Sequence, residues 1–434
     1  MTGSGIRAKT SGYTRHVSRE RRLVTLITVA AFVLRLAWVL SVSRDGFPYA
    51  DPLMYHVAAK NLIAGNGYSG IMGIPMVHWP PGYSVVLAGV YWVFGTNPVN
   101  GEILNALVGA LTVPLLYVTV RRAFNHRVAV IAAVMLCVMP GPILWSDMLV
   151  TETIYTCLFV GFMALAVRLR PSWKTAAFFG AYIGLSSLLR GEALVWVPVL
   201  MVLWFRPLGW RRMLAHCAAL FAVIALVLTP WTIRNERVFH SFIPLALNSG
   251  DTLWAGHNPA ATGTQNYPSK ELLLSIAGDT PEPQRTVVIA KGMQREAIHF
   301  MLHHPLAEAK LVPAKLIALM RGDSYAFDWL NLPPYRTLGT TGTMYVGVIA
   351  DFAWFSLLAL CIIGVVGLGR RTWRTPLLRA IRVSFLTGLV LYGFLYYGNY
   401  RYRLPYEPLM MVVAALVLER MWHALRSTES DETL

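Results

Sequence analysis

The chain alternates long apolar runs with short polar gaps. Runs such as Val24–Val42, Met213–Trp231 and Val346–Leu368 carry few charges and approach or exceed the length of about 20 residues that a helix needs to cross a bilayer. Because lipid offers the backbone no hydrogen bonds, such runs predict helices and an all-α, polytopic membrane protein. The pattern predicts about ten spans, near residues 23–43, 99–120, 127–145, 153–168, 174–189, 193–206, 212–230, 344–368, 382–397 and 406–422.

The polar segments between these runs set the predicted organisation. Residues 1–22 are expected to form a flexible, basic tail, and residues 425–434 a short, acidic and disordered one. A transmembrane core covers 23–230, includes a first outer loop at 44–98, and is followed by an outer segment at 231–342 and C-terminal spans at 343–424. The outer segment is mixed: it begins turn-rich and then has helical stretches near 284–303 and 305–320. It is expected either to shape an acceptor site or to serve only as a structural cover.

One short apolar run decides whether the predicted number of spans is odd or even. Residues 83–95 number only about 13, too few for a core of ~30 Å, so the run is predicted to be an interfacial helix on the outer side. Spans five and six are the least certain pair, because Arg190, Gly191 and Glu192 interrupt one apolar stretch.

Composition and charge support a membrane location. Hydrophobic residues make up 56% of the chain and charged residues 14%, against about 25% charged in soluble domains. The net charge of +16 comes largely from arginines in the short gaps, as at Arg121–Arg122 and Arg370–Arg371. This placement is typical of cytoplasmic loops, so it predicts cytoplasmic termini and the lipid bilayer, not nucleic acid, as the partner.

Several chemistries lack their sequence signatures. The four cysteines lie in apolar segments without a CxxC pair, which argues against a disulfide framework. No Walker A motif, no GxGxxG opening a helix and no HExxH is present, which argues against ATP-driven transport and zinc proteases. The first apolar run carries Arg35 and no A-x-A cleavage site, so it is interpreted as a retained span and not a signal peptide.

The first outer loop carries candidate functional residues. Asp51 before Pro52 is a good helix start and Gly65–Asn66–Gly67 a good stop, so a short surface helix is predicted between them. Tyr55 lies on one face of this helix, and Lys60 points elsewhere. Asp51 is either a functional acid or only an N-cap. His78 opens the rigid turn His78–Tyr83, as either a catalytic part or an interfacial hydrogen-bonding residue.

Further candidates lie at the outer ends of the predicted spans. Arginines there oppose the positive-inside trend and are therefore candidate phosphate ligands; they are Arg190, Arg234, Arg401 and Arg403. An ordinary ion pair with Glu192 is the alternative for Arg190. Asp147 and Glu152 are two candidate acids on one short loop, and Glu152 could also be only a favourable charge at a helix start. His299, His303 and His304 more simply belong to a solvated helix than to a zinc site.

Several of these pieces resemble one known superfamily. The pattern DPxxYxxxAxxLxxGxGY at 51–68 is followed by PPGY at 80–83 and then by sequence around Glu152, 189–194, 230–235, 248–263 and 401–405. In this order, over about 350 residues, they resemble GT-C glycosyltransferases that use polyprenyl-phosphate sugars. The similar groups include the aminoarabinose transferases of lipid A, the protein O-mannosyltransferases and the rhizobial core transferases.

The resemblance implies an enzyme of the inner or plasma membrane with an extracytoplasmic active site. It implies hexosyl or pentosyl transfer from a polyprenyl-phosphate sugar donor to a cell-envelope acceptor, which is a lipid, a polysaccharide or a protein. Inversion in one displacement is expected, with Asp51 as the base and Glu152 as a second acid. The four outer arginines and Lys60 are then expected at the donor phosphate, and Tyr55, His78 and Asp147 in the substrate pocket.

Two questions stay open at this level. A divalent cation, Mg or Mn, is an optional cofactor, and Asp51 and Glu152 would be its ligands. The alternatives to an enzyme are a lipid-linked-sugar flippase or transporter and a catalytically silent GT-C-like subunit. A transporter is expected to place ionisable residues near the midplane, whereas most of the unusual charges here cluster at the outer ends.

Overall fold

The computed structural model describes residues 4–42, 51–330 and 333–431; Arg44 and Asp45, at the start of the first loop, lie outside them. Within these ranges the chain forms helices and turns with one isolated bridge, between Ser69 and Pro75, which confirms the all-α prediction. The helices are α1 (Ser4–Ser41), α2 (Asp51–Ile63), α3 (Gly82–Phe94), α4 (Pro98–Ala123), α5 (His126–Val138), α6 (Pro140–Leu144), α7 (Glu152–Ala166), α8 (Trp173–Leu189), α9 (Val197–Phe239), α10 (Asn248–Gly256), α11 (Lys270–Ala277), α12 (Gln284–His303), α13 (Pro305–Leu319), α14 (Ala326–Leu330), α15 (Pro333–Gly367), α16 (Gly369–Trp373), α17 (Pro376–Val390) and α18 (Glu407–Asp431). Short turns of other helical types connect them: η1 (Ile71–Gly73), η2 (Trp145–Asp147), η3 (Gly191–Trp196), η4 (Asp323–Tyr325), η5 (Leu391–Leu395) and η6 (Tyr400–Tyr406).

Several helices are long and apolar enough to cross a membrane. Among the described residues there are 6 such stretches, or up to 7 if the bent pair α5 and α6–η2 counts as one span. The stretches are Ser18–Ser41, Pro98–Ala123, Gly191–Phe239, Thr337–Gly367, Pro376–Leu395 and Tyr400–Arg426. The chain is therefore a multi-spanning helical protein. The count of ten spans stays a prediction, because α7 has 15 residues and α8 has 17.

Local sequence explains where the helices break. Gly209 in α9 has a φ of 70°, which a residue with a Cβ rarely adopts, and the chain turns there between the two runs predicted as spans six and seven. Pro140 has no N–H to continue the helix, and α5 bends by 47° into α6. Arg190 ends α8 in an extended conformation, so the interruption at 190–192 is a true break between helices.

Close helix packing depends on small residues. A Cβ on Gly180 of α8 would lie 2.7 Å from the carbonyl oxygen of Leu220 in α9, so this contact requires glycine. Gly109 of α4 likewise faces the guanidinium of Arg35 in α1, where a Cβ would lie 2.9 Å from Nε. Small residues at such crossings let backbones approach in the absence of a hydrophobic drive between helices.

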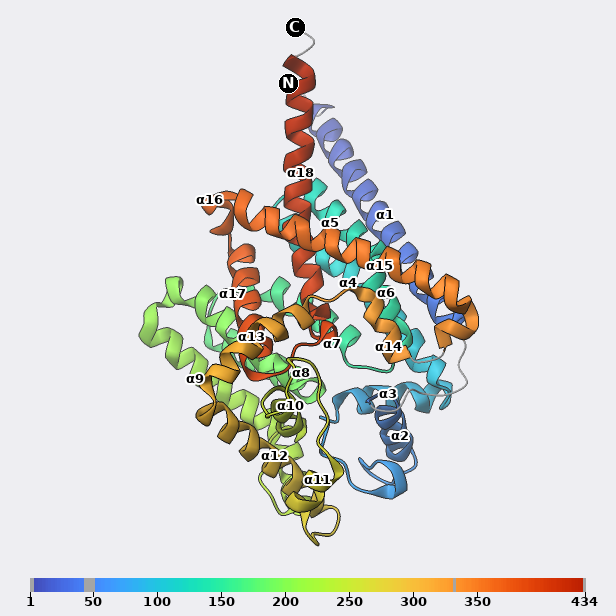
Figure 1. Ribbon diagram of the computed structural model, residues 1–434. Coiled ribbons are helices and arrows are strands. Elements are labelled where there is room, and N and C mark those ends of the chain that lie inside the picture. Colours follow the sequence, from blue (N-terminus) through green and yellow to red (C-terminus); the bar gives the residue numbers. More distant parts are fainter. Residues whose placement is uncertain (1–3, 43–50, 331–332, 432–434) are drawn as a thin grey trace.

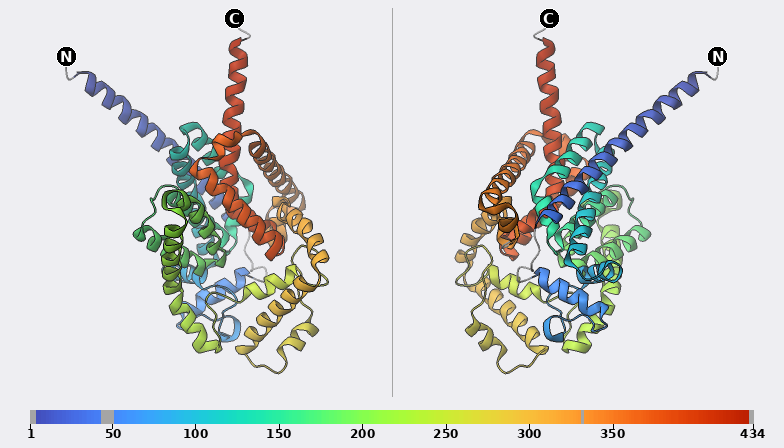
Figure 2. Two further views of the ribbon diagram at one scale, coloured as in Figure 1. Left: turned by 90° about the vertical axis from the view of Figure 1, so that its left-hand side faces the viewer. Right: turned by 90° about the vertical axis from the view of Figure 1, so that its right-hand side faces the viewer.

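The two termini and the outer segment lie at opposite ends of the molecule. The N-terminus of α1 and the C-terminus of α18 extend from one end, and α2, α10, α11 and α12 gather at the other (Figures 1 and 2). The arginine-rich α16 lies toward the end with the termini (Figure 1). Two termini at the same end agree with an even number of spans. That this end faces the cytoplasm stays a prediction.

Two predictions about the termini were wrong. The basic tail expected to be flexible is helical from Ser4, and the acidic tail expected to be disordered continues α18 to Asp431. Residues 432–434 lie outside the described range. Once a helix has formed in a span, each further residue that is fixed adds one hydrogen bond. Polar residues next to the span can therefore extend the helix readily.

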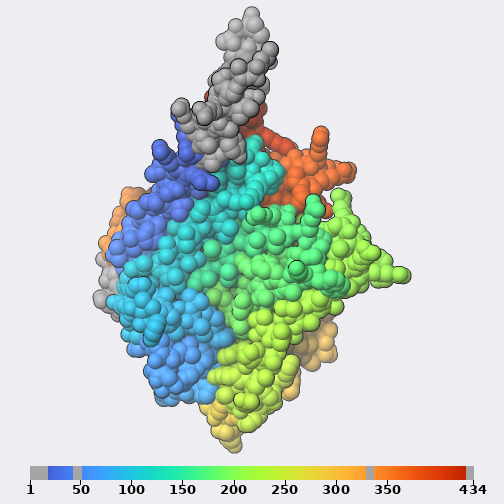
Figure 3. Space-filling view, turned by 180° about the vertical axis from the view of Figure 1, so that it is seen from behind, coloured from blue at the N-terminus to red at the C-terminus, as the bar shows by residue number. Residues whose placement is uncertain are grey.

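The outer segment packs on the first loop. The backbone N–H groups of Leu247 and Asn248 donate to the carbonyls of Val77 and His78 at 3.0 Å. Figure 3 shows the two segments side by side at the lower end of the molecule, in blue and yellow-green. The predicted helices at 284–303 and 305–320 are confirmed as α12 and α13.

The predicted topology can be tested by cysteine labelling. In a background without the four native cysteines, Thr96→Cys, in the exposed turn between α3 and α4, should react with an impermeant maleimide added outside intact cells. Arg371→Cys in α16, the matched control, should react only after the membrane is opened. Protection of residue 96 from the outside label would contradict the ten-span arrangement.

Candidate functional site

One arginine joins three segments that are far apart in the sequence. Arg401, in η6, donates from Nη1 to Oδ2 of Asp51 at 2.7 Å, at the start of α2. Its Nε donates to Oε1 of Glu152, the first residue of α7. The three side chains are 8%, 19% and 1% exposed, respectively. A cation thus lies between two carboxylates in the protein interior.

A second arginine completes the group. Arg190 donates from Nη1 to Glu152 and, at 3.1 Å, to the hydroxyl of Thr151. Its other nitrogens bind Glu192, with Nη2 at 3.2 Å from Oε1. The guanidinium also lies over the rings of Tyr155 and Tyr402, 5.7 and 5.6 Å from their centroids. We call Asp51, Glu152, Arg190, Glu192 and Arg401 the Arg401 cluster.

The charges in this cluster do not cancel. Three carboxylates face two guanidiniums, so the group carries one net negative charge when all five are ionised. Both arginines bind carboxylates, and Arg190 also binds the hydroxyl of Thr151; a phosphate offers acceptor oxygens of the same kind. A phosphate adds a further negative charge, so it can displace only a carboxylate that then reaches water or takes up a proton. Asp51, 19% exposed, is the most accessible of the three carboxylates.

Local turns place Arg401 at this point. The side chain of Asn399 accepts from the backbone N–H of Arg401 at 3.0 Å and so begins η6. Tyr402 stacks on Tyr392 with ring centroids 4.9 Å apart. A Cβ on Gly398 would lie 1.9 Å from the carbonyl oxygen of Lys315, so only glycine allows α13 to approach this loop.

A buried polar group in the outer segment holds the same loop. His257, after α10, binds Glu308 through Nδ1 at 2.7 Å, and its Nε2 lies 3.2 Å from the carbonyl of Leu395 and 3.1 Å from Nζ of Lys315. Burial lowers the pKa of Lys315 to about 8, although Glu308 opposes the shift. The outer segment is thus tied to the turn that precedes Arg401.

The side chain of Asp51 does more than start a helix. Its Oδ1 accepts from the indole Nε1 of Trp79 at 3.2 Å, while Oδ2 binds Arg401. Tyr55 is buried beneath, with its ring 6.1 Å from that of Trp79. His78 lies beside Trp79, with ring centroids 4.2 Å apart. The predicted pocket residues Tyr55 and His78 therefore lie against Trp79, the residue that donates to Asp51.

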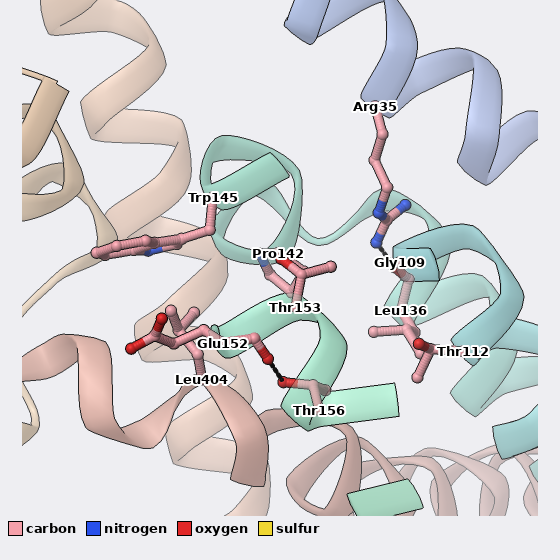
Figure 4. A pocket seen from close by; sticks show the side chains of 10 residues that line it. All are labelled: Arg35, Gly109, Thr112, Leu136, Pro142, Trp145, Glu152, Thr153, Thr156 and Leu404. Carbon is pink, nitrogen blue, oxygen red and sulfur yellow. Dashed lines mark hydrogen bonds between the residues drawn. The ribbon is translucent and has the colours of Figure 1, made fainter. Parts of the chain in front are cut away.

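A small cavity lies on the far side of Glu152. Its volume is about 30 Å³, and Arg35, Gly109, Thr112, Thr153 and Thr156 are among its lining residues (Figure 4). Arg35 is fully buried and donates to the carbonyls of Leu136 at 2.9 Å and Cys137 at 3.4 Å, where α5 ends. Arg35 thus satisfies carbonyls that the break before α6 leaves without helical partners.

The carboxylates do not form a ready metal site. In the part of the chain that the structure describes, no group of three His, Cys, Asp or Glu side chains converges as metal ligands would. Asp51 and Glu152 are both turned toward Arg401, a cation, which does not fit a metal ion held between them. We therefore derive no reaction step through a metal.

Comparison with known proteins relates this geometry to a fold. Residues 78–233, just over a third of the chain, match the family described as Dolichyl-phosphate-mannose-protein mannosyltransferase. The oligosaccharyltransferase of Archaeoglobus fulgidus, solved with Zn and sulfate, aligns over 93% of this chain at 16% identity and a TM-score of 0.53. The chain has the GT-C fold.

Two further solved structures align with most of this chain at low sequence identity. Archaeal AglB from the same organism, in complex with an inhibitory peptide and a dolichol-phosphate, aligns over 95% of this chain at 15% identity and a TM-score of 0.51. ArnT from Cupriavidus metallidurans, bound to undecaprenyl phosphate, aligns over 91% of this chain and 77% of its own at 16% identity and a TM-score of 0.42. This chain spans about half the length of the archaeal proteins, 49% and 51%. No curated protein matches the sequence.

Two of the predicted phosphate arginines lie outside the Arg401 cluster. Arg234, in α9, donates to the carbonyls of Met76 at 2.7 Å and Tyr68 at 2.9 Å, and so anchors the first loop. Arg403 binds Asp323 and the carbonyl of Arg321, and its guanidinium lies 3.7 Å from the centroid of Trp354. Both are held by their own partners, so they are better explained as structural.

Of the remaining candidates, only Glu152 belongs to the Arg401 cluster. Lys60 is exposed on α2, near His56, and nine residues after Asp51. Glu152, rather than Asp147, accepts from both arginines, and Asp147 is buried at the end of η2. His299 and His303 stack at 4.0 Å on an exposed part of α12, as expected for a solvated helix.

Sequence reasoning missed some members of the site. Trp79 and Thr151 were not chosen, and Glu192 was considered only as an ion-pair partner of Arg190. That pair is present, and Arg190 binds Glu152 as well. The run Arg190–Gly191–Glu192 at a helix break was the available signal for Glu192. For Trp79 the signal was its place next to His78 in the aromatic turn of the first loop.

The structural role of Arg403 predicts a loss of stability. Arg403→Leu leaves Asp323 and Glu407 buried without their cation, which should cost about 3–5 kcal/mol. Thermal unfolding of the purified protein in detergent measures this as a lower melting temperature. Arg321→Leu, an exposed neighbour, is the control and should change it little. A variant at 403 as stable as the wild type would contradict the structural assignment.

Proposed function

We propose that this chain transfers a sugar from a polyprenyl-phosphate donor to a cell-envelope acceptor at the extracytoplasmic face of the membrane. The observation that carries the proposal is the convergence of Arg190 and Arg401 on Glu152, with Asp51 bound to Arg401. The GT-C fold, the matched mannosyltransferase family and the dolichol-phosphate in the archaeal complex support this reading.

The first step is an exchange of ion-pair partners. Arginine has a planar fork of donors that matches the oxygens of a phosphate as well as those of a carboxylate. The donor phosphate therefore competes with Asp51 for Arg401. When Arg401 turns to the phosphate, Oδ2 of Asp51 loses its hydrogen-bond donor and is free to accept a proton from an acceptor hydroxyl.

The second step is a direct displacement. Asp51 takes the proton of an acceptor hydroxyl, whose oxygen forms a bond to the anomeric carbon of the sugar. The bond from that carbon to the phosphate oxygen breaks, and the electron pair leaves with the polyprenyl phosphate. The two guanidiniums stabilise the charge on this leaving group. One displacement inverts the anomeric centre.

The lipid tail of the donor has an apolar cavity available to it. A cavity of about 300 Å³ lies among α15, α17 and α18, with Arg403 as its one charged lining residue. Tyr392 and Tyr406 line it, and Tyr392 stacks on Tyr402, which in turn lies under Arg190. Lining residues such as Val365 and Val366 are exposed at the outer surface of the bundle, where lipid would be. The cavity is thus open to lipid on one side and separated from Arg190 by the stacked rings of Tyr392 and Tyr402.

The alternatives explain the geometry less well. A flippase or transporter is expected to carry its ionisable groups on broken helices near the midplane. Here Asp51 begins a helix of 13 residues at the end opposite the termini (Figure 1). A catalytically silent subunit would not need a carboxylate such as Asp51, which the donor phosphate can displace from Arg401.

The assigned base is tested by a transfer assay. Purified protein is given a panel of polyprenyl-phosphate hexoses and pentoses, and release of the polyprenyl phosphate is measured. Asp51→Asn keeps the shape of the side chain but cannot take the proton, so the rate should fall about 10²–10⁴-fold. Asp279→Asn, exposed in the outer segment, is the matched control. Full activity of Asp51→Asn would exclude Asp51 as the base.

A further inference from the structure

A second polar pair lies near Asp51. His78, in the first loop, faces Asp251, in the first turn of α10, and Trp79 connects the pair to Asp51. The two segments are already joined by their backbones, since the N–H of Asn248 donates to the carbonyl of His78 at 3.0 Å. The side chains are therefore not needed to hold the loop and the helix together.

The two side chains have hydrogen-bonding capacity to spare. Nε2 of His78 and Oδ2 of Asp251 are 3.5 Å apart, which is longer than a normal hydrogen bond. Oδ1 of Asp251 is buried and has no side-chain partner in the described part of the chain, so Oδ2 is the oxygen that a ligand can reach. Burial raises the pKa of Asp251, whereas His78 and the backbone hydrogen bonds of Asp251 and Thr252 lower it.

The pair is also the accessible part of this region. The side chains of His78 and Asp251 keep 32% and 40% of their surface, whereas Glu152 keeps 1% and Arg401 keeps 8%. A ligand that reaches Asp51 from the outer solution would meet them first. Trp79 adds an aromatic ring between the pair and the carboxylate.

This set of groups matches the chemistry of a sugar ring. A carboxylate oxygen accepts from hydroxyl groups, an imidazole both donates and accepts, and an indole offers an apolar face to the C–H groups of the ring. Sites that bind small ligands combine an apolar or aromatic surface with a few polar groups that set the orientation of the ligand.

We propose that His78, Trp79 and Asp251 form a subsite that binds the hydroxyl groups of a sugar ring next to Asp51. The proposal rests on the proposed glycosyl transfer and deepens it. The ring belongs either to the donor or to a sugar-containing acceptor. Asp251, outside the first loop, would then give the outer segment a part in substrate selection.

Binding measurements separate this subsite from the phosphate site. Undecaprenyl phosphate, which has no sugar, should bind Asp251→Asn and the wild type equally, within about twofold. Undecaprenyl-phosphate hexoses and pentoses should bind Asp251→Asn about 10-fold more weakly if the ring is that of the donor, since a hydrogen bond to a charged group is lost. His78→Gln is the second variant and should act in the same direction, with Asp279→Asn as the control.

The other source of the ring gives a different result. If the acceptor supplies it, donor binding is unchanged, and Asp251→Asn raises the KM for a sugar-containing acceptor about 10-fold at a similar kcat. Equal donor binding together with an equal acceptor KM in both variants would overturn the subsite and leave the proposed function standing. Failure of the wild type to bind undecaprenyl phosphate or any of the sugar donors would overturn both proposals.

Discussion

The structure depends on one constraint: Arg401 lies between two carboxylates that the fold removes from water. A buried charge without a partner costs several kcal/mol, so Asp51, Glu152 and Arg401 must stay together or gain a new counter-charge. They come from α2, α7 and η6, which no local interaction would bring together. Their pairing therefore joins the surface helix of the first loop to the spans of both halves of the chain.

The surrounding elements hold that arginine in place. Glycine at 398 lets α13 approach the loop before η6, and His257 with Lys315 ties the outer segment to the same loop. The outer segment thus supports the backbone that carries Arg401. In the proposed exchange, a ligand with a phosphate displaces Asp51 from Arg401, since Asp51 is the most exposed of the three carboxylates, while Glu152 stays with both arginines.

The sequence pattern predicted the local helices but not the directions of individual side chains. Helix signals predicted α2, α12 and α13 well, because caps and prolines act through neighbouring residues. Arg401 and Arg403 looked equivalent, as two outer-end arginines in one RYR motif. In η6 the side chain of Arg401 points toward Asp51 and that of Arg403 toward Asp323. The direction of each side chain depends on tertiary packing, which the sequence pattern does not contain. For the same reason Asp251, on a distant helix, gave no signal of its place beside His78.

The central claim is that Asp51 and the donor phosphate compete for Arg401, and binding of undecaprenyl phosphate to Asp51→Asn tests it most directly. Isothermal titration in detergent would compare this variant with the wild type. Removing the carboxylate charge frees Arg401, so Asp51→Asn should bind undecaprenyl phosphate more tightly, by about 10-fold for an ion pair worth about 1.4 kcal/mol. Weaker binding by the variant, or binding equal to the wild type, would contradict the exchange.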